Sequence, residues 1–151
     1  MNDVLALAEE NQGKAWRVVE ASGLIAAWES IGAEVHLVGS LKTGLLMKHR
    51  DIDFHIYTAK LEPEKSFAAM AKIAANPAVE RVTYGNLAAT DEHCFEWHAW
   101  FRDADGELWQ LDMIQIERGT FYDGYFERVA ERISAVLTPE LKLAILTVKN
   151  D

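Results

Sequence analysis

The chain has 151 residues, of which 50% are hydrophobic and 26% charged, a composition typical of one globular domain. Its formal net charge of −9 disfavours a long nucleic acid as a partner, because binding along a phosphate backbone needs a basic face. The single cysteine, Cys94, excludes an internal disulfide. No apolar run approaches the ~20 residues that span a bilayer, and the acidic N-terminal segment does not resemble a signal peptide. We therefore expect one cytoplasmic domain over residues 1–151, with no membrane partner.

The first half of the chain predicts helices followed by two strands. Residues 3–31 carry apolar positions at helical spacing with interruptions at Gly13 and Gly23, which predicts a short helix and then a longer one ending near Gly32. The run EVHLVGS predicts a strand that stops at Gly39-Ser40, and LKTGLLMK predicts a short helix or turn. In DIDFHIYT the alternation predicts one core face and one polar face, made respectively by Ile52, Phe54 and Ile56 and by Asp51, Asp53, His55 and Tyr57.

The second half predicts a hairpin between helices. Residues 62–76 read as a helix with Pro63 in its first turn, and residues 78–86 as a strand. Two aromatic-rich strands follow over 93–103 and 107–116, joined by a turn at Asp105-Gly106. Two closing helices are predicted over 120–136 and 139–149, the second starting at Thr138. The hairpin implies antiparallel pairing, so we expect an α+β fold whose mixed, mainly antiparallel sheet carries helices on one side.

Asp51 and Asp53 give the strongest chemical signal in the sequence. Two residues apart on a strand, they leave the same face roughly 7 Å apart. Side-by-side carboxylates repel each other unless a cation lies between them, which favours a divalent metal. Gly39-Ser40, ten residues earlier, ends the preceding strand where a glycine and a hydroxyl suit a phosphate, the more so if a helix begins at Leu41.

This pattern resembles that of the DNA polymerase beta-like nucleotidyltransferases. VGS, the spacer LKTGLLMKHR and DIDF match that superfamily's Gly-Ser and Asp-apolar-Asp motifs, and the resemblance covers about residues 35–116. Among its members, the chain is most similar to the small bacterial aminoglycoside- or lincosamide-type and minimal nucleotidyltransferases. The resemblance implies a third carboxylate on a later strand, for which Asp112 is the best match. Glu96 remains an alternative, whereas Asp103 and Asp105 belong to the hairpin turn.

The resemblance also implies a reaction and its cofactors. Asp51, Asp53 and Asp112 would bind Mg2+ or Mn2+ and act in catalysis, while Gly39, Ser40 and Lys42 would hold the triphosphate of an NTP, with ATP the expected nucleotide. The enzyme would transfer an NMP to a hydroxyl of a small molecule or a protein and release pyrophosphate. The short segment after the last strand leaves two options open: a shallow acceptor pocket, or one that a second subunit of a homodimer completes.

The sequence leaves the roles of some other residues open, and it also allows other functions. His55 and His98 could approach the site, but a lone strand histidine is more often a packed or surface residue than a ligand. Trp97, Trp100 and Trp109 suit either stacking on a planar ligand or core packing, with core packing expected for two of the three. The alternatives to an enzyme are an inactive binding module with the same fold and a toxin–antitoxin component that modifies a partner or a tRNA end.

Overall fold

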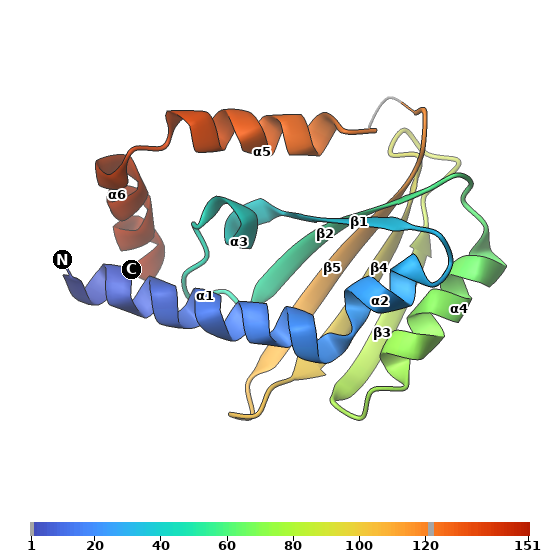
Figure 1. The fold of residues 1–151 in the computed structure, drawn as a ribbon, viewed down its shortest axis with the longest axis horizontal. Coiled ribbons are helices and arrows are strands. Elements are labelled where there is room, and N and C mark those ends of the chain that lie inside the picture. The colour runs from blue at the N-terminus through green and yellow to red at the C-terminus, as the bar shows by residue number, and fades with distance from the viewer. Residues whose placement is uncertain (1, 121–122) are drawn as a thin grey trace.

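A five-stranded mixed sheet forms the centre of the molecule, as the computed structural model, which describes residues 2–120 and 123–151, shows (Figure 1). The strand order is β1-β2-β5-β4-β3. Only β2 and β5 pair in parallel, and the other three neighbouring pairs are antiparallel. The strands are β1 (Glu34–Val38), β2 (Asp51–Thr58), β3 (Val79–Asn86), β4 (Cys94–Arg102) and β5 (Leu108–Glu117). The α+β class and the mainly antiparallel sheet expected from the sequence are confirmed.

Helices α1 (Asn2–Ser22), α2 (Leu24–Glu29) and α4 (Pro63–Ala74) cover one face of this sheet, and their buried residues share one core with it. The short α3 (Gly39–Thr43) follows β1 directly. Helix α5 (Tyr125–Val136) runs on the other side of β1 from α1, and α6 (Pro139–Asn150) returns to contact α1 (Figure 1). Thr138 caps α6 by accepting a hydrogen bond from the Leu141 backbone N–H, as its sequence predicts.

The two N-terminal helices have the opposite lengths to those predicted. Gly13 lies inside the 21-residue α1, and the break comes at Gly23, whose φ is 67°. A glycine inside a helix costs only about 1 kcal/mol, which the burial of Ala15 and Val18 on the core side of α1 outweighs. The left-handed conformation of Gly23 does end the helix, because few other residues adopt it without strain.

The core face is made of large side chains with satisfied polar atoms. Trp97 and Trp109 are buried, whereas Trp100 points to the opposite face, so core packing of two of the three tryptophans is confirmed. Gln115 is fully buried, accepts a hydrogen bond from Trp97 Nε1 and donates to Thr58 and Ser66. A buried amide with all these partners ties β2, β4, β5 and α4 together.

The other face of β2 is polar only at its start. His55 and Tyr57, expected on a polar face, are buried. Helix α5 explains this, because Glu127 accepts a hydrogen bond from the Tyr57 hydroxyl at 2.5 Å and lies 3.9 Å from His55 Nδ1. On this face of β2, Asp51 and Asp53 are therefore the side chains that remain accessible to solvent. They are also the residues that the sequence singles out.

Trp28 is the side chain whose loss should destabilise the fold most clearly. It is fully buried, donates from Nε1 to Met113 Sδ at 3.3 Å and packs edge-on against Trp97. Truncation of such a side chain costs about 3–5 kcal/mol, so Trp28→Ala should lower the urea midpoint strongly. Trp16→Ala, at a side chain that is 52% exposed, should change the free energy of unfolding by less than about 0.5 kcal/mol. Equal losses in the two variants would contradict this core assignment.

Candidate functional site

The parallel pairing of β2 with β5 brings the predicted carboxylates onto one patch of the sheet. Asp53 lies directly opposite Asp112, and Asp51 lies opposite Gln110. Directly opposed residues on neighbouring strands share a face of the sheet, so the three aspartates point to the same side. The face opposite to the core therefore carries three carboxylates, two at the start of β2 and one in the middle of β5.

Gly39 lies against this patch from the neighbouring strand. Val38 is paired with Asp53, and the chain turns at Gly39 with a φ of 74° straight into α3. The helix thus begins at Gly39 and not at Leu41, and Ser40 lies in its first turn. A Cβ added to Gly39 would overlap Asp53 Oδ2 and come within 3.0 Å of Asp53 Cγ. The glycine is therefore required by the close approach of Asp53 as well as by the positive φ.

Asp53 is held in an environment that opposes its charge. Burial, followed by the negative charges of Asp112 and Asp51, raises the pKa of Asp53 to about 6. All three causes act in the same direction, and no neighbouring cation of the described chain offsets them. An electrostatic cost of this kind at a partly exposed site is a recognised mark of a functional position.

Asp112 differs from Asp53 because it is tied into a hydrogen-bond network. Its Oδ1 lies 2.5 Å from His98 Nδ1 and accepts from Gln110 Nε2 at 2.7 Å. The other ring nitrogen of His98 lies 2.6 Å from Glu96 Oε1. Burial disfavours the charged ring, but the hydrogen bonds to Glu96 and Asp112 outweigh it and raise the pKa of His98 above its usual value. Asp112 and Glu96, the two candidates for the third metal-binding carboxylate, thus contact the same imidazole ring.

Two members of this network did not stand out in the sequence. For His98 the sequence allows an approach to the site but favours a packed or surface role, and Gln110 gives no signal. Alternation places Glu96 and His98 on one face of β4, but their proximity to Asp112 depends on the β4–β5 register, which pairs His98 with Asp112. Residue types locate the hairpin turn, but the register follows from the backbone geometry of that turn, which residue types do not fix.

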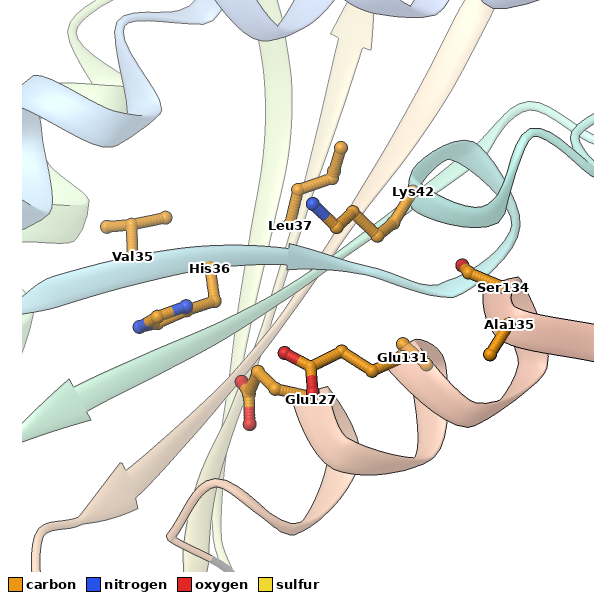
Figure 2. Close-up of a pocket in the computed structure, with 9 residues that line it drawn as sticks. Val35, His36, Leu37, Lys42, Glu127, Glu131, Ser134 and Ala135 are labelled. Atoms are coloured by element: carbon orange, nitrogen blue, oxygen red, sulfur yellow. The ribbon is translucent and has the colours of Figure 1, made fainter.

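Ser40 and Lys42 belong to α3, which contacts α5. Lys42 lines a cavity of about 800 Å3 between β1, α3 and α5, together with His36, Glu127 and Glu131. Figure 2 shows Lys42 extending over β1 beside Leu37, with the two glutamates reaching up from α5. The cavity therefore combines one lysine with two carboxylates.

Arg50, the last residue of the spacer, makes a contact outside the patch. Arg50 pairs with Glu107, which also accepts from Lys14 at 3.3 Å. Asp103 accepts hydrogen bonds within the hairpin turn and from Trp109 Nε1, as expected of a turn residue. Burial leaves the pKa of the Cys94 thiol raised to about 11, so this cysteine is not a reactive nucleophile.

The donor set of the patch suits a hard divalent cation. Mg2+ and Mn2+ prefer carboxylate oxygens. Three carboxylates lie on this patch, and the negative charges of Asp112 and Asp51 act on Asp53. In the arrangement described for residues 2–120 and 123–151, no three His, Cys, Asp or Glu side chains already converge to hold a metal ion. The residues present fit such an ion in their chemistry, and they lie on one face of the sheet.

The raised pKa of Asp53 predicts a distinct pH dependence of stability. Because the native state binds this proton more tightly than the unfolded chain does, the contribution of Asp53 is most favourable at low pH and is lost as the pH rises through about 6. Asp53→Asn, which mimics the protonated group, should therefore raise the melting temperature at pH 7.5 without metal and reduce its change between pH 7.5 and 5. Asp91→Asn, at an exposed loop aspartate, should leave both unchanged. A parent-like pH profile in Asp53→Asn would contradict this assignment.

Comparison with protein-family models finds no match, and comparison with curated proteins finds none either. Solved structures do match. The Cid1 poly(U) polymerase with bound MgATP is 18% identical with a TM-score of 0.68, over 93% of this chain and 42% of that one. A cytoplasmic RNA terminal U-transferase is 16% identical with a TM-score of 0.61, over 99% and 46%. The GLD-2/RNP-8 complex is 9% identical with a TM-score of 0.66, over 99% and 58%.

These similarities establish the fold. The α+β architecture is the nucleotidyltransferase fold that the Gly-Ser and Asp-apolar-Asp motifs suggest. The chain spans about half the length of the structures that it matches. No helix within the described residues is both long enough and apolar enough to cross a membrane.

Proposed function

We propose that this chain is a metal-dependent nucleotidyltransferase that transfers an NMP from an NTP to an acceptor hydroxyl and releases pyrophosphate. The observation that carries the proposal is the register that sets Asp53 opposite Asp112, with Asp51 on the same strand and Gly39 against Asp53. The nucleotidyltransferase fold of the matched structures, one with bound MgATP and another with bound MgGTP, supports the same reading. Within this superfamily we propose the small bacterial aminoglycoside- or lincosamide-type and minimal nucleotidyltransferases as the type that the chain is most similar to.

The proposed roles follow from position. Asp51, Asp53 and Asp112 would hold Mg2+ or Mn2+, with Asp112 also accepting the proton of the acceptor hydroxyl. When bound, the ions neutralise phosphate charge and lower the pKa of the attacking hydroxyl. Ser40 would contact the triphosphate beside Gly39, and Lys42, from the cavity wall, would supply a positive charge to it. The protein's part is positioning and charge placement, as in phosphoryl transfer generally.

For the acceptor we propose a small molecule or a protein hydroxyl. The net charge of −9 opposes binding along a phosphate backbone. The matched structures include polymerases that act on RNA, so RNA is the acceptor class against which this proposal must be tested.

Transfer of label tests both parts of the proposal. The protein is incubated with each of the four α-32P NTPs, Mg2+ and cell extract, and the products are separated into small molecules, protein and RNA. We expect label, with ATP the preferred donor, in small molecules or protein, and none with the Asp51→Asn/Asp53→Asn variant. Label confined to RNA would overturn the acceptor class. Equal labelling by the parent and the double variant would overturn the enzymatic proposal.

A further inference from the structure

We infer that His98 is a positioning residue that holds the Asp112 carboxylate in the orientation needed to bind the metal ion. The inference rests on the proposed function, because it assigns a task at the same site. It concerns a residue of β4, a strand that carries none of the three aspartates.

The geometry of the Asp112 carboxylate carries the inference. Both of its hydrogen bonds, from His98 Nδ1 at 2.5 Å and from Gln110 Nε2 at 2.7 Å, reach the same oxygen, Oδ1. Within the part of the chain that the structure describes, Oδ2 has no hydrogen-bond partner. One oxygen is therefore fixed by the protein and the other is left for a cation. Metal-binding carboxylates are commonly held in this way by a neighbouring hydrogen bond.

The position of β5 in the sheet explains why such a hold is needed. Asp112 has Asp53 on the β2 side and His98 on the β4 side, each directly opposite in register. Repulsion between Asp53 and Asp112 acts across the first of these pairs and favours rotation of Asp112 out of the site. A hydrogen bond from the second pair fixes the Asp112 side chain against that rotation.

His98 is itself fixed from its far side. Nε2 lies 2.6 Å from Glu96 Oε1, and Glu96 is two residues away on the same strand and face. The ring is therefore held between two carboxylates, with only 23% of its side chain exposed. Because the ring is fixed at both nitrogens, it loses little further freedom when Asp112 binds a ligand. A hydrogen bond of this kind behind a metal ligand makes the binding site rigid.

Two substitutions at one position separate this role from a general structural one. His98→Ala removes the hydrogen bond to Asp112, whereas His98→Asn places an amide N–H close to where Nδ1 lies. Thr83→Ala serves as a matched control, because Thr83 is paired with His98 from β3 on the side away from Asp112. Melting temperature and circular dichroism show whether each variant is folded.

The measurement is the dissociation constant of Mn2+, by electron paramagnetic resonance, with a non-hydrolysable ATP analogue present. We expect His98→Ala to weaken Mn2+ binding by about 10–100-fold. His98→Asn should recover most of the affinity, and Thr83→Ala should match the parent. If His98→Ala binds Mn2+ as the parent does, or if His98→Asn is as weak as His98→Ala, the inference is wrong while the proposed function stands. If the parent itself binds no Mn2+, the proposed function fails, and this inference fails with it.

Discussion

Asp53→Asn is expected to reduce nucleotidyl transfer by at least about 10²–10³-fold, the loss seen when one group that stabilises transition-state charge is removed. The asparagine side chain matches the protonated aspartate in shape, and the pKa of about 6 means that the fold readily accepts a neutral group here. The loss should therefore appear in turnover and not in folding. The measurement is the initial rate of pyrophosphate release at saturating NTP and Mg2+, with the acceptor identified by labelling.

Asp91→Asn supplies the matched control for this prediction. It makes the same chemical change in an exposed loop, and it should keep the parent's rate. A folded Asp53→Asn variant that retains more than about a tenth of the parent's rate would show that Asp53 is not part of the charge-stabilising machinery.

Gly39→Ala should both destabilise the protein and abolish its response to metal and NTP. An L-residue in the left-handed region costs about 1–2 kcal/mol, and Gly39 has a φ of 74°. In addition, the new methyl group would overlap the Asp53 carboxylate and displace it from the patch. The measurements are the urea midpoint, for stability, and the rise in melting temperature on adding Mg2+ and NTP, for binding.

Gly106→Ala separates these two effects of the alanine. Gly106 has a φ of 81°, but nothing lies within 4 Å of the place where its Cβ would be. This variant should lose similar stability from backbone strain and keep the full response to Mg2+ and NTP. If Gly39→Ala keeps that response as well, the close approach of Asp53 to Gly39 has no part in forming the site.

Local sequence patterns were sufficient to predict the strands and the face on which the aspartates lie. A charged residue alternating with Ile52 and Phe54 has to leave the sheet on the side opposite to the core. The Asp105-Gly106 turn likewise defines the β4–β5 hairpin, since Gly106 adopts the positive φ that the turn needs. These features depend on neighbours in the chain, which is why residue types reveal them.

Features that depend on tertiary packing could not be predicted from the sequence. The burial of His55 and Tyr57 is caused by Glu127, about seventy residues later on α5. The contact between His98 and Asp112 depends on a cross-strand register, and a shift of one residue would turn His98 to the other face of the sheet from Asp112. The helix break predicted at Gly13 was wrong for a related reason. Burial of one face of α1 outweighs the low helix propensity of a glycine.

The most direct test of the account is the melting temperature of the parent protein titrated with Mg2+ and ATP together and with each alone. Since a ligand that binds the native state stabilises it by mass action, about 2.7 kcal/mol at a hundred times its dissociation constant, the combination should raise the melting temperature by several degrees. The Asp51→Asn/Asp53→Asn variant should show no such rise. A parent protein whose melting temperature does not respond to Mg2+ with any NTP would contradict the assignment of Asp51, Asp53 and Asp112 as a metal-dependent nucleotide site.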